Sequence, residues 1–267
     1  MTSLPGETWI VGCGKMAGAM VEGWRRAGID LSGATAFRPS GVPVEGVRTG
    51  SIICGEVMPR LVLLGVKPQK LDEVAPILAK YLNSDAILVS ILAGVEIASL
   101  RARFPHAGQI VRAMPNLPVS EGRGVVALTG GDRSIDPLFA LLGTVVRTDS
   151  EAELAAIGSL AGAGPAYVAR FIAALSKAGI ERGLDPALAD RVALETVLGT
   201  AVMAKARGET MESIAVRVAS PNGTTEAGLK VLDKGLDQLV AETIAAASRR
   251  GEELAAAARI DLTPPLA

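Results

Sequence analysis

The stretch TWIVGCGKMAG, residues 8–18, joins a short apolar run to a glycine-rich turn and to the start of a helical pattern. Gly12 and Gly14 permit a tight turn, and they let backbone N–H groups approach a pyrophosphate at the positive end of the following helix. Glycine pairs also make plain turns. The apolar run before this pair, the helical pattern after it and its place at the start of an alternating strand–helix pattern predict a dinucleotide-binding loop.

Short apolar runs alternate with helical patterns through the first half of the chain. Runs of this length suit strands buried on both faces of a parallel sheet. The predicted strands are 8–12, 33–37, 60–66, 86–92, 109–114, 124–129 and 144–148, and the predicted helices are 15–27, 70–81, 95–103 and 134–142. This rhythm predicts an α/β fold, a Rossmann-type doubly wound sheet, over residues 1–150. The segment between Arg38 and Arg60 is short for the usual helix, although a crossover needs only about a dozen residues.

Strand signals stop near residue 150, and the remainder predicts an all-helical domain over residues 151–267. The predicted helices are 151–160, 164–182, 186–207, 210–218, 224–234 and 236–258. Asp185 and Pro186 suit an N-cap and a first helical turn, and Gly183 and Gly208 suit helix ends. The helix at 164–180 is apolar nearly all round, which fits either a dimer core or the central helix of a monomer.

The composition excludes several classes of protein. A net charge of −1 removes the electrostatic argument for nucleic acid, with a local basic patch as the alternative, and no apolar stretch is long enough to span a membrane. Two cysteines, Cys13 and Cys54, and one histidine, His106, are too little for a disulfide framework or a metal site, so we expect no metal. The N-terminus lacks the basic flank of a signal peptide. We therefore expect a cytoplasmic protein.

Several predicted strands end in residues suited to a ligand at the carboxyl edge of the sheet. The second predicted strand is followed by Arg38 and Ser40 rather than by the acidic residue that holds the ribose hydroxyls of NAD, and this pair suits the 2′-phosphate of NADP. A solvated surface Arg is the alternative. The other strand ends carry VKPQ (66–69), SILAG (90–94) and RAMPN (112–116). Because the ends point to one crevice, we expect NADP(H) there.

Two turns in the second half lead into helices. GAGPAY (162–167) opens the long apolar helix, and its small residues suit a purely structural close approach to a neighbouring segment. SPNGTT (220–225) feeds the start of a helix and presents free N–H groups and hydroxyls, as an anion site does. Ordinary N-capping by Thr224 explains this second pattern equally well.

The motifs GCGKM, VKPQ, VSILAGV, RAMPNLP, GAGPAY and SPNGTTEAGL, in that order and over nearly the whole chain, resemble those of the pyrroline-5-carboxylate reductase family. The RAMPN and SPxGTT blocks are specific to that family, whereas the glycine loop is not. The resemblance implies a Rossmann domain and a helical domain that interleaves with a partner chain in a homodimer, from which larger oligomers can assemble. It also implies reduction of a cyclic imino acid, 1-pyrroline-5-carboxylate, to L-proline with NADP(H), or with NAD(H).

The resemblance also assigns roles to particular residues. Ser220, Gly223 and Thr224 would hold the substrate carboxylate, and Thr225, the catalytic candidate, would hydrogen-bond the imine nitrogen. The dinucleotide would be lined by Val11, Gly12, Cys13, Gly14, Lys15, Met16, Arg38, Ser40, Gly65, Val66, Lys67, Pro68 and Ala93. An iminium carbon is already electrophilic, so hydride transfer to it needs positioning more than a strong general acid.

The chain departs from the family pattern at a few positions. Asn222 stands where a glycine is usual, Ala161 and Ala163 where serines are usual, and KMA (15–17) where N-M-G is usual. Asn tolerates a left-handed backbone, so the turn can form, but its bulk near the substrate leaves open a reductase of a related cyclic imine.

Two further alternatives belong to other classes. A β-hydroxyacid dehydrogenase resembles this chain in its glycine spacing, but Val168 stands where those enzymes carry the acid/base Lys. A non-catalytic NADP-binding protein would bind the dinucleotide without turnover, and an activity assay separates it from an enzyme.

Overall fold

The computed structural model describes the backbone of residues 3–260 and the side chains of residues 3–256. The chain forms two compact units, unit 1 (Met1–Ala163 and Ala247–Ala267) and unit 2 (Gly164–Ala246). The strands of unit 1 are β1 (Thr8–Val11), β2 (Ala34–Phe37), β3 (Arg48–Gly50), β4 (Leu61–Leu64), β5 (Ile87–Ser90), β6 (Gln109–Pro115), β7 (Gly124–Thr129) and β8 (Gly143–Arg147). Its helices are α1 (Lys15–Arg26), α2 (Leu71–Leu78), α3 (Ile97–Arg103), α4 (Asp136–Ala140) and α5 (Glu151–Ile157), with short helical turns η1 (Pro68–Lys70), η2 (Ala79–Tyr81), η3 (Leu117–Glu121) and η4 (Gly158–Gly162).

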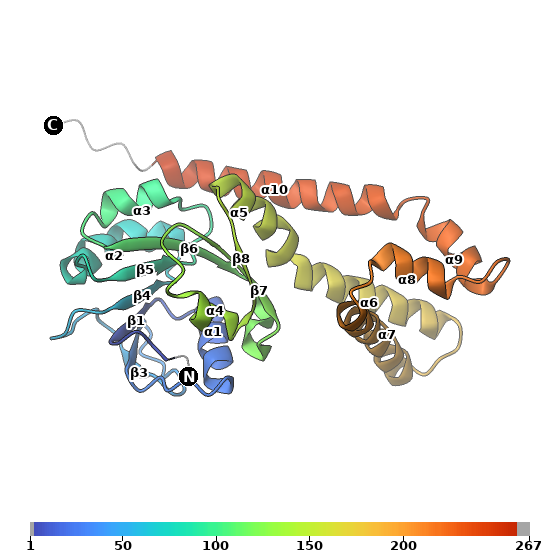
Figure 1. The fold of residues 1–267 in the computed structure, drawn as a ribbon, viewed down its shortest axis with the longest axis horizontal. Coiled ribbons are helices and arrows are strands. Elements are labelled where there is room, and N and C mark those ends of the chain that lie inside the picture. The colour runs from blue at the N-terminus through green and yellow to red at the C-terminus, as the bar shows by residue number, and fades with distance from the viewer. Residues whose placement is uncertain (1–2, 261–267) are drawn as a thin grey trace. The chain divides into compact units, whose positions relative to one another are not determined.

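The sheet of unit 1 has the strand order β3-β2-β1-β4-β5-β6-β7-β8 (Figure 1). The first six strands in this order, from β3 through β1 to β6, run parallel. Strand β1 pairs with β2 on one side and with β4 on the other. The direction of the strand order therefore reverses beside β1, where open α/β sheets bind ligands. The register aligns Val11 with Phe37 and Leu64, and Leu64 with Ser90, so these strands end at one edge. The predicted Rossmann-type sheet is confirmed.

Helices cover both faces of this sheet, as Figure 1 shows with α1 and α4 on one face and α2 and α3 on the other. Alternate side chains of each strand enter opposite cores: Ile10 packs with the first pair of helices, whereas Trp9 and Val11 pack with the second. The Trp24 indole N–H donates to the Leu138 carbonyl at 2.9 Å and ties α1 to α4. The sheet is thus a rigid, doubly covered support for its carboxyl edge.

Two features of the sheet are not predicted from the sequence. The short edge strand β3 pairs with β2, and it has no apolar run because its residues Arg48, Thr49 and Gly50 are not buried. Strand β7 runs antiparallel to β6. The connection between them, 116–123, is shorter than the dozen or so residues that a parallel crossover requires.

The predicted helix at 151–160 is interrupted. Helix α5 ends at Ile157 and is followed by a π turn, η4. Two contacts explain the change: the Asn116 side-chain amide donates to the Ala161 carbonyl at 3.0 Å, and Gly158 lies so close to Met114 that a Cβ there would be 1.9 Å from its sulfur. Inserted hydrogen bonds of this kind are a known cause of π turns.

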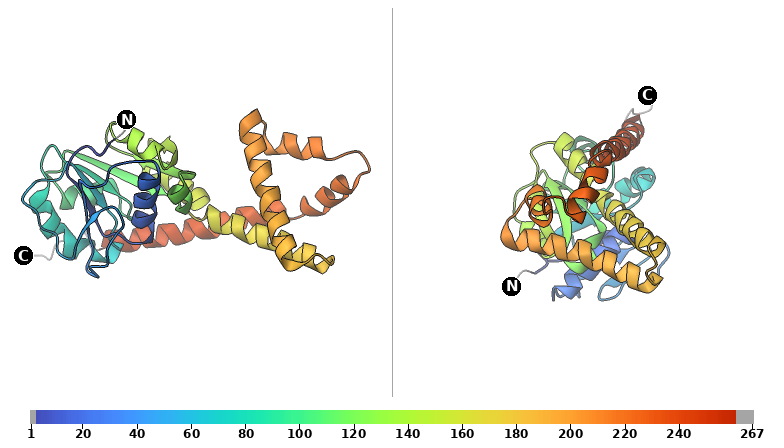
Figure 2. Two further views of the ribbon diagram at one scale, coloured as in Figure 1. Left: turned by 90° about the horizontal axis from the view of Figure 1, so that it is seen from below. Right: turned by 90° about the vertical axis from the view of Figure 1, so that its right-hand side faces the viewer.

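Unit 2 is all helical, as predicted. It contains α6 (Gly164–Glu181), α7 (Pro186–Arg207), α8 (Met211–Val218), α9 (Thr224–Leu232) and the first part of α10 (Leu236–Ile260). Asp185 caps α7 by accepting from the N–H groups of Ala187 and Leu188, and Gly208 ends it in the left-handed conformation. After the turn at 182–185, α7 runs back across α6 (Figure 2). Among the described residues, no helix is long and apolar enough to cross a membrane.

Candidate functional site

The glycine turn after β1 has the geometry of a dinucleotide loop. Gly12 has φ +86°, and a Cβ there would lie 2.6 Å from the backbone nitrogen of Val66. Only glycine therefore fits between β1 and the end of β4. The turn brings the predicted cofactor segments 11–16 and 65–68 into contact.

The space in front of Gly14 is open. A Cβ on Gly14 would meet no atom within 4 Å. Gly14 is the N-cap of α1 and supplies no side-chain cap, and within the described chain the N–H groups of Gly14, Lys15 and Met16 make no hydrogen bond. Free N–H groups at the positive end of a twelve-residue helix suit a pyrophosphate. These residues fit the dinucleotide that the sequence predicts.

Three cations in or near these segments are unpaired within the described chain. Arg38 follows β2, is half-buried, and lies near enough to Cys13 for its charge to favour the thiolate. Burial has the larger effect, and it raises the pKa of the Cys13 thiol. Arg38, Lys15 and Lys67 form no ion pair with the described residues, so their charges are available to an anion.

Ser40 lies in the turn that begins at Arg38. The Arg38 carbonyl accepts from the N–H of Gly41 at 3.0 Å, and the Ser40 hydroxyl oxygen accepts from the N–H of Val42 at 3.4 Å. The Ser40 side chain is exposed. The predicted pair Arg38 and Ser40 therefore belongs to one tight turn at the end of β2.

The RAMPN block lies at the same edge but faces inward. Arg112 and Asn116 are 5% and 7% exposed. The Asn116 side chain bonds the backbone of two other segments. Its amide N–H donates to the Ala161 carbonyl, and its amide oxygen accepts from the N–H of Val125 at 2.8 Å. Arg112 pairs with Glu151 of α5, a residue that sequence reasoning did not single out. The buried side chains of Arg112 and Asn116 thus hold neighbouring segments of the chain in place, and they do not line the crevice.

The turn at 220–225 presents unused polar groups. The hydroxyls of Ser220, Thr224 and Thr225 make no hydrogen bond with the described residues, and neither do the N–H groups of Thr224 and Thr225. Helix α9 begins at Thr224, its N-cap is Gly223, and no side chain caps it. Ordinary N-capping by Thr224, one of the two sequence interpretations, is therefore wrong.

Asn222 and Gly223 shape this turn. Asn222 is the one non-glycine residue with positive φ in the described chain, at +58°, as its tolerance of the left-handed region allows. Its backbone N–H donates to the Glu226 carboxylate at 2.6 Å, and Glu226 pairs with Lys230 at 3.0 Å. A Cβ on Gly223 would lie 2.3 Å from the Ser220 hydroxyl oxygen. The turn is therefore built around its glycine, with the Ser220 hydroxyl directed toward Gly223.

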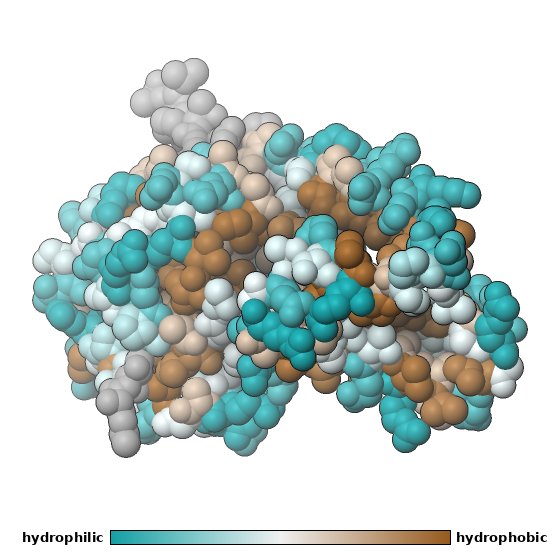
Figure 3. Space-filling model, turned by 45° about the vertical axis from the view of Figure 1, so that its right-hand side comes forward, coloured by the Kyte–Doolittle hydropathy of each residue, from teal (hydrophilic) through white to brown (hydrophobic). Residues whose placement is uncertain are grey.

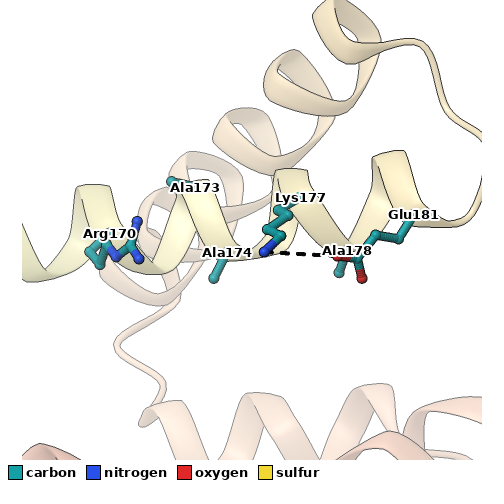
Figure 4. A pocket seen from close by; sticks show the side chains of 6 residues that line it. All are labelled: Arg170, Ala173, Ala174, Lys177, Ala178 and Glu181. Carbon is teal, nitrogen blue, oxygen red and sulfur yellow. Dashed lines mark ion pairs between the residues drawn. The ribbon is translucent and has the colours of Figure 1, made fainter.

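The long helices of unit 2 expose apolar side chains. Val168 and Phe171 on α6 are 49% and 43% exposed, and Val202 on α7 is 58% exposed. Apolar side chains also interrupt the polar surface in Figure 3. An open hollow runs along α6 and is lined by Arg170, Ala173, Ala174, Lys177, Ala178 and Glu181, with Lys177 paired to Glu181 (Figure 4). Its small residues leave room for a neighbouring helix.

The described residues offer few groups for binding a metal ion. His106 lies in an exposed turn after α3, and the described residues contain no group of three or more potential metal ligands.

Known proteins resemble the chain in both halves. Residues 151–254 match the family described as pyrroline-5-carboxylate reductase dimerisation. Pyrroline-5-carboxylate reductase of Synechocystis sp. is 41% identical over 204 residues, which are 73% of this chain and 74% of that protein. The enzyme of the same name from Pseudomonas aeruginosa is 32% identical over 92% of this chain and 96% of its own length.

Solved structures give the same result for the fold. A pyrroline-5-carboxylate reductase from Coxiella burnetii superimposes with a TM-score of 0.85 at 30% identity, over 93% of this chain and 98% of that one. Pyrroline carboxylate reductase of Plasmodium falciparum, solved with NADP bound, superimposes with a TM-score of 0.83 at 24% identity, over 95% of this chain and 100% of that one. By relatedness over most of its length, the chain belongs to the pyrroline-5-carboxylate reductase family.

Proposed function

We propose that this chain reduces 1-pyrroline-5-carboxylate to L-proline with NADPH. When bound, NADPH would be the source of the hydride for the imine carbon; the imine nitrogen would take up a proton, and the C=N double bond would become a C–N single bond. The observation that carries the proposal is the turn at 220–225, whose hydroxyls and helix N-terminal N–H groups are uncommitted within the described chain. It occurs in a chain related to reductases of this name over most of its length.

The cofactor residues act by binding and orientation. The N–H groups of Gly14, Lys15 and Met16 hold the pyrophosphate, and Gly12 lets the chain pass close to Gly65 and Val66. Arg38 and Ser40 bind the 2′-phosphate, which favours NADPH over NADH. Val11, Cys13, Lys67, Pro68 and Ala93 complete the lining.

The substrate residues act on the carboxylate and on the imine. Ser220, Gly223 and Thr224 hold the carboxylate at the positive end of α9. The Thr225 hydroxyl hydrogen-bonds the imine nitrogen and relays a proton to it, with water as the alternative donor. Asn222 lies within this turn with an exposed side chain, so we assign it to the choice among cyclic imines.

We further infer that two chains form a homodimer in which their helical halves interleave, and that larger oligomers can be built from this dimer. The exposed apolar side chains of α6 and α7 and the hollow along α6 support this arrangement, as does the dimerisation match over residues 151–254. We assign residues 1–150 to dinucleotide binding and residues 151–267 to substrate binding and dimerisation. The free cysteines Cys13 and Cys54 favour the cytoplasm as its location.

The test is a spectrophotometric assay of NADPH oxidation with the purified chain. The substrates are 1-pyrroline-5-carboxylate and two alternatives, pyrroline-2-carboxylate and piperideine-6-carboxylate. We expect the highest kcat/KM with the first and release of L-proline. A higher value with either alternative would move the assignment to a related imine, and NADPH binding without oxidation of any of them would make the chain a non-catalytic binder.

A further inference from the structure

The loop between β5 and α3 crosses the carboxyl edge of the sheet beside β4. It carries the exposed Ala93 and then Gly94, whose φ is +75°. A Cβ on Gly94 would lie 3.0 Å from the backbone nitrogen and Cα of Ala255, so α10 covers one side of this loop. A loop that lines a ligand crevice has to be held in one conformation for the ligand to be held in one place.

An ion pair beneath the loop connects its two ends. Arg112 on β6 pairs with Glu151 of α5, and its other terminal nitrogen lies 3.5 Å from the Leu92 carbonyl at the start of the loop. The second carboxylate oxygen of Glu151 accepts from the N–H of Ile97 at 2.9 Å. Ile97 is the first residue of α3, where the loop ends. One ion pair, between a buried arginine and a half-buried glutamate, therefore contacts both residue 92 and residue 97.

Stability alone does not account for this pair. An ion pair with a buried partner often adds little to stability, because removing the Arg112 charge from water is costly. In addition, the Nε of Arg112 is buried and has no hydrogen-bond partner in the described chain, which adds an uncompensated donor. Proteins commonly tolerate such a cost in stability where a side chain holds a functional segment in one conformation.

The position of the loop indicates which half of the dinucleotide it faces. The glycine turn after β1 suits the pyrophosphate, and Arg38 after β2 suits the 2′-phosphate of the adenosine half. A dinucleotide bound across the reversal of strand order extends to the other side of β1, over the ends of β4 and β5. The loop at 92–97 lies on that side, where the nicotinamide half would bind.

We propose that Arg112 and Glu151 are positioning residues that hold the loop 92–97 in place for the nicotinamide half of the cofactor. The inference rests on the proposed function for the identity of the cofactor. It assigns a role to Glu151, and it explains why an arginine occupies a buried strand position.

The test compares Glu151→Gln with a matched control, Asp136→Asn. Asp136 forms a similarly sheltered ion pair with Arg147, and Arg147 bonds the carbonyls of Gly130 and Asp132 beside Gln109, at the opposite end of β6. Both variants lose one negative charge from unit 1. Affinity is measured for NADPH and for 2′,5′-ADP, which carries only the adenosine half, and amide hydrogen exchange is measured over residues 93–97.

We expect Glu151→Gln to weaken NADPH binding about tenfold, the loss typical of one hydrogen bond to a charged group, and to leave 2′,5′-ADP affinity unchanged. Exchange at 93–97 should accelerate, and Asp136→Asn should alter neither affinity. Equal weakening of both ligands by Glu151→Gln, or equal NADPH affinities of the two variants, would overturn the proposal.

A second variant and the wild-type chain separate the other outcomes. If Glu151→Gln does not fold, Arg112→Lys keeps the charge toward Glu151 but gives up the contact with the Leu92 carbonyl, and the same pattern of affinities applies to it. A wild-type chain that binds NADPH but does not oxidise it would refute the proposed reaction, whereas the comparison of affinities would still decide the role of the pair.

Discussion

Replacing Arg38 by methionine removes a cation from the end of β2 and keeps a side chain of similar reach. Because the guanidinium has no hydrogen-bond or ion-pair partner in the described chain, we expect the free energy of unfolding to change by less than about 0.5 kcal/mol. A contact between a guanidinium and a phosphate is a charge-assisted hydrogen bond, whose loss costs about 1.5–3 kcal/mol. Since about 1.4 kcal/mol corresponds to a factor of ten, NADPH affinity should fall about 10- to 100-fold.

NADH has no 2′-phosphate, so its affinity should change by less than about twofold. Both affinities are measured by titration of the nicotinamide fluorescence, with Arg25→Met as control, because Arg25 lies in the same unit but pairs with Glu45 at 2.7 Å. Equal losses for NADPH and NADH would refute the role of Arg38 at the 2′-phosphate. A loss of the same size in the control would indicate a general effect of net charge.

The remaining predictions concern the two turns and the buried thiol. Gly12→Ala should weaken NADPH binding by at least about tenfold in the same titration, since its Cβ would lie 2.6 Å from a backbone nitrogen at positive φ; Gly33→Ala, whose Cβ meets nothing within 4 Å, should bind normally. Thr225→Ala should lower kcat substantially and keep NADPH affinity, with activity restored in Thr225→Ser; unchanged kcat in the alanine variant would remove Thr225 from the mechanism. Burial raises the pKa of the Cys13 thiol, so the folded protein holds this proton more tightly than the unfolded chain does. The resulting contribution to the free energy of unfolding is fully present below the ordinary thiol pKa, and it is lost as pH rises through the raised pKa. Unfolding by denaturant should therefore show a flatter alkaline decline for Cys13→Ala than for the wild-type chain.

Burial explains which parts of the fold can be predicted from the sequence. Strands β1, β4 and β5 are buried on both faces, so their sequences are continuous apolar runs that match the predicted segments closely. Strand β3 is exposed or half-buried at the sheet edge and has no such run. The π turn η4 depends on Asn116 and Met114, which are distant in sequence, and no local pattern reports such contacts.

The same distinction applies to the candidate site. The glycine turn and the turn at 220–225 could be predicted because all of their chemistry lies within a few consecutive residues. Glu151 could not, since its partners Ile97 and Arg112 are 54 and 39 residues away in sequence. A carboxylate at the start of a helix is also an ordinary helix-stabilising feature, so nothing in the local sequence distinguishes this one.

The helices that carry the turn at 220–225 bury few of their own side chains. Within residues 164–246 the buried side chains are Ser176, Ala189, Ala193, Ala204 and Ile214, which is too little apolar surface for a core. Helices in proteins are stabilised mainly by packing an apolar face, and here large apolar side chains such as Phe171 are exposed. The dimerisation match over 151–254 includes these helices and the turn at 220–225. We therefore expect association between chains and order at that turn to be thermodynamically linked, so that each favours the other.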